Sequence, residues 1–361
     1  MLYPSPHLTP KMKPFPHFVV AFSIAVGCAS GKTDAQLQAD VVASLDKLMA
    51  GKIKALNQAA RNLQSAAPQP TGRGWDAVAD QQAIADMKAE WAKMRDAWES
   101  AEGVISPLFP SLDQALDSRY EELLSGLPQG DADLFDGQGV TGMHAMERIL
   151  YAPDISPDVL AQEMLLSGYV APAWPATPEQ AAELRNGLAA ELVNDTQQLV
   201  TKWTANALSP AVAFKGVTGL MDEQQEKVEL AANHDDESRY SMRTLADLEQ
   251  NLSGTSAIYD LFSPWVDSKP AGSVADDQAL LALDRLRGTY ATYQASYGDA
   301  LPPAPPTWDL AMLSDADMQS PFGVLYLSVV AEVDPNRPGS IVDGLNRIAQ
   351  ILGLPQFVPA P

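Results

Sequence analysis

The sequence predicts an all-α protein made of two helical bundles. Apolar residues recur at intervals of three and four over long stretches, which places them on one face of a helix. The alternation of apolar and polar residues that marks half-buried strands is nearly absent. The chain is also rich in alanine and leucine, which favour helices. A Pro-rich segment at 169–178 divides the helical regions, so we expect a four-helix-type bundle on either side of this linker.

A short apolar run near the N-terminus has the features of an export signal. Lys11 and Lys13 precede an apolar run at 18–27, and small residues follow it. A basic start, a short apolar centre and small residues near the end are the pattern of a signal peptide. The run is too short to span a membrane. We therefore predict a signal peptide at 1–27.

Cys28 indicates which kind of signal this is. Residues 25–28 read AVGC and resemble a bacterial lipobox, so we expect Cys28 to become the lipidated first residue of the mature chain. Membrane contact would then be made through this lipid anchor only. The alternative is an ordinary secretory signal with an incidental cysteine, and the start at Met1 or Met12 is left open. Because Cys28 is the single cysteine, an intrachain disulfide is excluded.

The N-terminal bundle is expected at 34–168. Its first helix has a continuous apolar face, its second ends at Pro107, and Ser111 is placed to cap the third. Gly- and Pro-containing turns separate these stretches. The helices are predicted at 34–67, 77–105, 111–124, from Gly142 to about Tyr151, and at 159–166.

The C-terminal bundle is expected at 178–355. Thr177 and Pro178 form a good helix start, because threonine caps a helix and proline fits its first position. The Pro-rich run at 301–306 is expected to be a stiff connector. The helices are predicted at 178–207, 211–233, 238–262, 276–296 and about 321–352, the last with a break near 335–338.

The charge balance limits the classes of partner. The chain carries 24 basic and 46 acidic residues, a net charge of −22 at pH 7. Such a charge disfavours nucleic acids and anionic membrane surfaces, and it favours cations or basic proteins. Many exported bacterial proteins are simply acidic, and that explanation stays open.

The string GMHAME at 142–147 is the clearest candidate for part of a functional site. His144 and Glu147 are three residues apart, so on a helix an imidazole and a carboxylate lie on one face and can converge on one ion. The apolar residues that follow predict that this helix is packed into a core. Taken alone, His144 is better explained as a buried, hydrogen-bonded histidine.

Further carboxylates precede this motif. Glu99 and Glu102 form a second pair three residues apart, and Asp117 lies in the next predicted helix. Helical bundles that gather carboxylates and a Glu/His pair in their core are a known way to build a metal site. An oxygen-rich site suits iron, manganese, calcium or magnesium better than copper(I). For the glutamate pair alone, the alternative is a solvated helix surface.

An ordered set of motifs across 34–355 resembles the imelysin family, and within it the EfeO/EfeM-type proteins of ferrous-iron uptake. The motifs are W-E-x-x-E at 98–102, L-F-P-S-L-D at 108–113, L-D-x-R at 116–119, T-G-M-H-x-M-E-x-x-L at 141–150 and E-S-R-Y-S-x-x-T-L-A-D-L-x-x-N-L-x-G at 237–254. One departure is Met242, where ferrous-uptake members often carry a histidine.

The resemblance implies two four-helix bundles, an envelope location and a metal site near the H-x-x-E string. Together with the pairing of carboxylates, it predicts one cation site. Its residues are His144, Glu147, Glu99 and Glu102, with Asp117 and Glu237 as additions, the latter from the other bundle.

We therefore expect an exported, lipid-anchored protein of the bacterial cell envelope, in the periplasm or at the outer membrane. It binds a divalent metal ion in metal acquisition, with iron as the first candidate and zinc, manganese or calcium as alternatives. Its partner would be an envelope iron-transport or surface protein, and nucleic acid is not expected. The first rival is a metal-dependent peptidase of the imelysin type, although the H-E-x-x-H pattern is missing. The second is a module that binds a polymer or peptide without metal.

Overall fold

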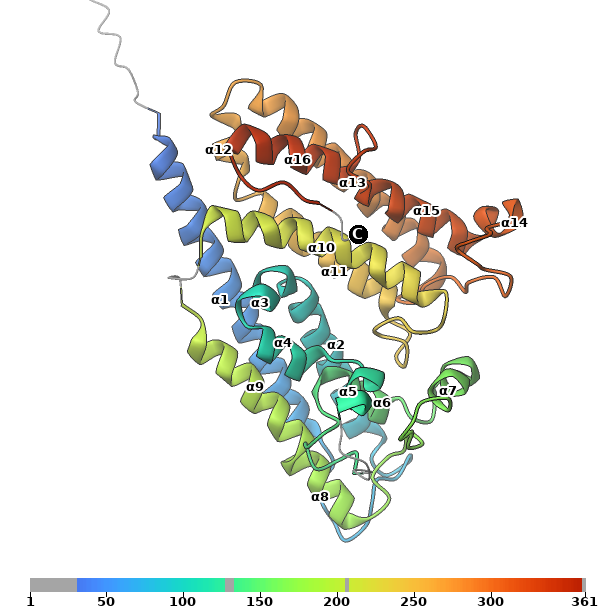
Figure 1. Ribbon diagram of the computed structural model, residues 1–361. Coiled ribbons are helices and arrows are strands. Elements are labelled where there is room, and N and C mark those ends of the chain that lie inside the picture. Colours follow the sequence, from blue (N-terminus) through green and yellow to red (C-terminus); the bar gives the residue numbers. More distant parts are fainter. Residues whose placement is uncertain (1–30, 127–132, 205–207, 359–361) are drawn as a thin grey trace, which may run out of the picture. The chain divides into compact units, whose positions relative to one another are not determined.

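The computed structural model describes residues 31–126, 133–204 and 208–358, and in these ranges every regular element is a helix (Figure 1). The all-α prediction is confirmed. In chain order the helices are α1 (Asp34–Ala66), α2 (Gln81–Glu99), α3 (Glu102–Leu108), α4 (Pro110–Asp117), α5 (Tyr120–Gly126), α6 (Gly142–Leu150), α7 (Pro157–Glu163), α8 (Pro178–Asn186), α9 (Leu188–Lys202), α10 (Pro210–Ala231), α11 (Thr244–Tyr259), α12 (Ser263–Asp267), α13 (Gly272–Tyr297), α14 (Asp315–Gln319), α15 (Pro321–Val333) and α16 (Ile341–Leu352).

The predicted signal peptide at 1–27 and its lipidation residue Cys28 lie outside the described residues. Within the described ranges, none of the helices combines the length and the apolar character that crossing a membrane requires.

Helix α1 forms the axis of the first half of the fold. Its apolar residues from Leu37 to Leu63 are buried at helical spacing, as the sequence predicts. Helices α2 and α9 pack along it, and the three run side by side in Figure 1. In the second half, α10 packs against α11, and α13 packs against α16.

The helix predicted at 77–105 is divided in the structure. α2 ends at Glu99 and α3 begins at Glu102, and Pro107 lies inside α3. A tertiary contact lies at the break: a Cβ atom at Gly254 of α11 would lie only 2.5 Å from the carbonyl oxygen of Ser100. The chain at the break therefore touches the backbone of α11. Glu99 and Glu102 consequently lie on two helices and do not share one helical face.

Other predicted boundaries shift for similar reasons. The helix at 111–124 is two helices, α4 and α5, and the helix at 178–207 is divided at Gly187. A Cβ atom at Gly187 would lie 2.2 Å from the carbonyl oxygen of Asp136, so a distant loop crosses the chain there. The helix at 238–262 begins only at Thr244. The predicted break near 335–338 is confirmed, because α15 ends at Val333 and α16 begins at Ile341.

The division into bundles at 34–168 and 178–355 stays a prediction. Helix α9, which was expected in the second bundle, packs on α1. The Pro-rich segment 169–178 is also tied to the first half, since Trp75 N donates to the Pro175 carbonyl over 2.8 Å. Residues Asp34–Pro361 form one compact unit, with a hydrophobic core whose buried residues run from Leu37 to Leu352.

Two glycines allow α3 and α10 to touch. A Cβ atom at Gly216 of α10 would lie 2.7 Å from Val104 Cγ2 and 2.8 Å from the Gly103 carbonyl oxygen. A Cβ atom at Gly103 of α3 would in turn lie 2.4 Å from the Gly216 carbonyl oxygen. This backbone contact brings Glu102 of α3 close to the polar face of α10.

We expect Gly216→Ala to lower the free energy of unfolding by about 1–3 kcal/mol, because the added methyl group forces α3 away from α10. Gly219→Ala is the matched control, since it lies one turn later in α10 and its Cβ would meet nothing within 4 Å. That change should raise stability by about 1 kcal/mol through helix propensity. Urea unfolding of both variants measures the difference, and equal stabilisation by both would show that the contact does not limit the fold.

Candidate metal centre

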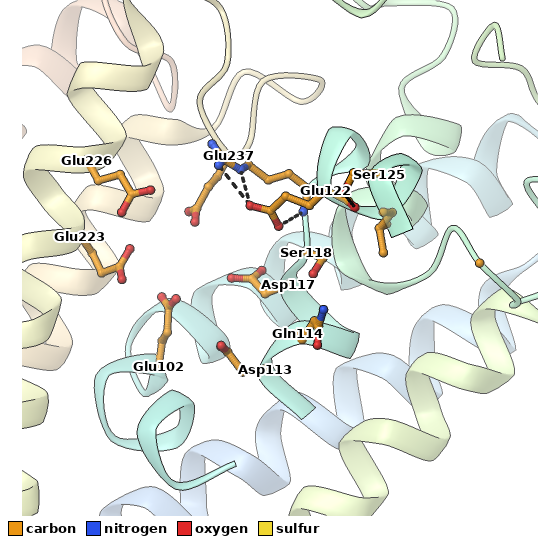
Figure 2. Close-up of a pocket in the computed structure, with 13 residues that line it drawn as sticks. Glu102, Asp113, Gln114, Asp117, Ser118, Glu122, Ser125, Glu223, Glu226 and Glu237 are labelled. Carbon is orange, nitrogen blue, oxygen red and sulfur yellow. Dashed lines mark hydrogen bonds and ion pairs between the residues drawn. The ribbon is translucent and has the colours of Figure 1, made fainter. Parts of the chain in front are cut away.

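An acidic cavity of about 720 Å³ opens between α3, α4, α5, α10 and the segment 232–243, which joins α10 to α11 (Figure 2). Among the described residues that line it, Arg119 is the one basic residue. The carboxylates that line it are Glu102, Asp113, Asp117, Glu122, Glu223, Glu226 and Glu237. The cavity is therefore suited to a cation.

Three of the predicted residues meet at the inner wall of this cavity. Oxygen atoms of Glu102, Asp117 and Glu237 lie within 4.8 Å of one another, a spacing that allows one metal ion to bind all three. Figure 2 shows the three carboxylates directed toward a common space. Glu102 is buried, and its Oε2 has no hydrogen-bond partner in the described part of the chain. An unpaired, buried carboxylate oxygen is costly unless a cation or a proton satisfies it.

Arg95 of α2 lies behind these carboxylates and is fully buried. Its guanidinium is paired with Glu99 and Asp117, and it lies 3.2 Å from Glu237 and 3.8 Å from Asp247. Burial alone would lower the pKa of Arg95, but Asp117 and Asp247 raise it above its usual value. Arg95 is therefore a permanent internal cation.

Lys227 of α10 is the second internal cation. Its Nζ is paired with Glu237 and lies 3.4 Å from Glu99 and 3.8 Å from Glu223. Burial would lower the pKa of Lys227, yet Glu237 and Glu102 raise it. Lys227 thus stays charged although its side chain is buried.

Carboxylates nevertheless outnumber these two cations. Burial, and then the charge of Glu223, raise the pKa of Glu102 well above its usual value. Burial likewise raises the pKa of Glu223 to about 7 and that of Asp247 to about 6, against the opposing charges of Lys227 and Arg95. The cluster holds excess negative charge, which a proton or a bound cation can neutralise.

His144 lies between two carboxylates. Its Nε2 is 3.2 Å from Asp117 Oδ1, outside hydrogen-bond alignment, and its Nδ1 is 3.3 Å from Glu147 Oε2. Burial and Arg95 would lower the pKa of His144, but Asp117 and Glu147 raise it to about 9. His144 is therefore a buried imidazolium at neutral pH, and it must lose its proton before it can bind a metal ion.

The other two predicted residues, Glu147 and Glu99, do not line the cavity. Glu147 Oε1 accepts a hydrogen bond from the backbone N–H of Ser241 over 2.8 Å. Glu99 is paired with Arg95 and accepts from Asn251 Nδ2 over 2.8 Å. The structure thus brings all six predicted residues into one network. Glu102, Asp117 and Glu237 meet with the spacing of cation ligands at the cavity, and Glu99 and Glu237 do so in a second, deeper group with Asp247. The six-residue site stays a prediction.

Sequence reasoning missed Arg95, Lys227, Glu223 and Asp247. A local signal existed for the first three, since Arg95 pairs with Glu99 and Glu223 with Lys227 four residues apart on a helix. Asp247 lies on a fully buried polar stripe of α11 that continues at four-residue spacing with Asn251 and Thr255. Buried polar residues at helical spacing are the pattern that indicates it.

A family model described as Imelysin, with the short name Peptidase_M75, matches residues 38–316. The chain belongs to the imelysin family. The resemblance of its motifs is thereby confirmed. The chain is 24% identical over 215 residues to a protein of Pseudomonas syringae pv. syringae (strain B728a) named iron uptake system component EfeM. The match covers 59% of this chain and 62% of EfeM, so the chain spans about three fifths of the length of that relative.

A solved structure has the same fold. The crystal structure of an imelysin-like protein from Psychrobacter arcticum 273-4 superposes with a TM-score of 0.54, at 12% sequence identity. The match covers 91% of this chain and 99% of the other. At this identity it supports the arrangement of helices that an imelysin family member is expected to have.

We expect Lys227→Met to destabilise the metal-free protein by about 3–5 kcal/mol, because it removes a buried cation and leaves Glu237 and Glu99 with Arg95 alone. Lys93→Met removes the same charge from an exposed pair with Glu90 and should cost less than about 1 kcal/mol. Urea unfolding measures both. A cost for Lys227→Met no larger than that of Lys93→Met would contradict the role of Lys227 as an internal counter-ion.

Proposed function

We propose that this imelysin family member is a lipid-anchored protein of the cell envelope that binds a divalent metal ion in iron acquisition. Three findings support the proposal: the family, the similarity to a protein named as an iron uptake component, and the acidic cavity. The ion is cargo in this proposal. Iron is the first candidate, with manganese, zinc or calcium as alternatives, and an envelope transport or surface protein is the proposed partner.

The observation that carries the proposal is the meeting of Glu102, Asp117 and Glu237. Carboxylate oxygens are hard ligands that suit ferrous and manganous ions. Both internal cations contact the same oxygen of Glu237, Oε2, which leaves its other oxygen for an ion. Glu102 offers Oε2, which has no hydrogen-bond partner among the residues that the structure describes. An ion bound here would offset part of the excess negative charge of the cluster.

The remaining predicted residues contact the groups that surround this site. His144 lies against Asp117 and orients its carboxylate, and it becomes a ligand only if it gives up its proton. Glu99 holds Arg95 in place, and Glu147 contacts the segment that carries Glu237. In the proposal, Glu102, Asp117 and Glu237 contact the ion directly, while His144, Glu99 and Glu147 fix the groups around it.

Titration calorimetry with Mn²⁺, and with Fe²⁺ under anaerobic conditions, tests the site. We expect Glu102→Gln and Glu237→Gln each to raise the dissociation constant at least about tenfold, or about 1.4 kcal/mol, because each loses a charged ligand. Glu226→Gln is the matched control, because it removes the same charge from the wall of the same cavity but outside the three-residue group. It should change the dissociation constant less than about threefold.

Equal losses of affinity in all three variants would mean that the cavity attracts cations only through its overall negative charge. The assignment of Glu102, Asp117 and Glu237 as ligands would then be wrong. No stoichiometric binding by the wild type would overturn the metal-binding proposal itself. Metal-dependent cleavage of casein by the wild type, lost in Glu102→Gln, would instead favour the peptidase alternative that the family name raises.

The anchor is tested separately. Cys28→Ala should release the protein from the membrane fraction and abolish incorporation of labelled fatty acid, since Cys28 is the only residue proposed to carry lipid. Fractionation of cells that express either form gives the measurement. If the variant sediments with membranes to the same extent as the wild type, the lipid anchor is ruled out.

A further inference from the structure

The segment 232–243 carries Glu237 at the wall of the acidic cavity, and two of its residues have an unusual backbone conformation. His234 and Met242 both have a φ of 58°, in the left-handed region that residues with a side chain rarely adopt. Such conformations persist only where surrounding contacts enforce them. The contacts that hold this segment therefore decide where Glu237 lies.

Two of these contacts lie just beyond Glu237 in the sequence. The hydroxyl of Tyr240 donates to Glu163 Oε1 at the end of α7, and both side chains are buried. The backbone N–H of Ser241 donates to Glu147 Oε1 of α6. Neither contact involves a residue that lines the acidic cavity.

Glu163 is itself held rigidly. Arg148 donates to Glu163 Oε2 from Nη2 over 2.8 Å and from Nε over 3.0 Å, and its guanidinium lies 3.8 Å from the centre of the Tyr120 ring. The same Nη2 donates to the carbonyl of Val170 over 2.6 Å. Arg148 directly follows Glu147, so two consecutive residues of α6 hold the same segment, one at Ser241 and one through Glu163 at Tyr240.

We infer that Tyr240 and Glu163 are positioning residues, which fix the segment 232–243 so that the Glu237 carboxylate reaches the cation. The inference rests on the proposed function. Without the Tyr240 hydroxyl, the segment 232–243 loses a buried hydrogen bond three residues from Glu237. The backbone at Met242 can then relax from its positive φ to a more common conformation. Because Tyr240→Phe changes no formal charge, a loss of cation affinity in that variant comes from a displaced Glu237 carboxylate.

The test is a double-mutant cycle on Mn²⁺ affinity, measured by calorimetry with the full mature chain. Tyr240→Phe alone should weaken binding about fivefold or more. In the Glu237→Gln background, Tyr240→Phe should alter Mn²⁺ affinity less than about twofold. The carboxylate that Tyr240 positions is already absent from that background. A merely structural role predicts the same factor in both backgrounds.

Tyr259→Phe is the matched control. The Tyr259 hydroxyl is also buried and donates to a carboxylate, Asp276, over 2.6 Å, but it joins α11 to α13 away from the cavity. It should leave Mn²⁺ affinity within about twofold of the wild type. Thermal unfolding of each metal-free variant shows that the fold is retained.

The outcomes separate the two proposals. If the wild type does not bind Mn²⁺, or Glu237→Gln binds as well as the wild type, the proposed site fails, and the inference fails with it. If Glu237→Gln weakens binding but Tyr240→Phe does not, only the positioning role is overturned. An equal effect of Tyr240→Phe in both backgrounds overturns it too. If Tyr240→Phe does not fold, Glu163→Gln takes its place in the cycle, and failure of both to fold assigns the pair to the fold alone.

Discussion

The buried guanidinium of Arg95 is the interaction on which the rest of the centre depends. It contacts carboxylates from its own helix, from α4, from the segment 232–243 and from α11. A buried cation is tolerated only when such partners are all in place, and removing one partner leaves an uncompensated charge. The four elements are therefore held in a single arrangement by one side chain, and the position of Asp117 and Glu237 follows from it.

The same interaction explains how so many carboxylates can gather at one cavity. Arg95 and Lys227 neutralise the inner part of the cluster, which keeps the carboxylates together. The part that faces the cavity keeps an excess of negative charge, and there burial and the neighbouring charge of Glu223 raise the pKa of Glu102 well above its usual value. The internal cations set the geometry, and the residual negative charge is the basis of the proposed preference for a positive ligand.

Local patterns in the sequence predict local structure well here. The spacing of apolar residues predicts α1 and α10, and the pairing of His144 with Glu147 follows from their three-residue separation in α6. The break between α2 and α3 was missed because it lies at a contact with Gly254, which is distant in sequence. Lys227 and Asp247 were missed as parts of the centre for the same reason, since only the packing of α10 and α11 brings them to Arg95. The arrangement in two bundles stays a prediction.

The distance in sequence between the partners at the centre has a consequence for how the protein folds. Glu237 is 142 residues from Arg95, so their contact closes a long loop, which costs chain entropy and forms late relative to contacts within helices. We therefore expect the helices to form before the centre does. The proposed ion would bind only the finished fold, so it would be captured after folding and would slow unfolding.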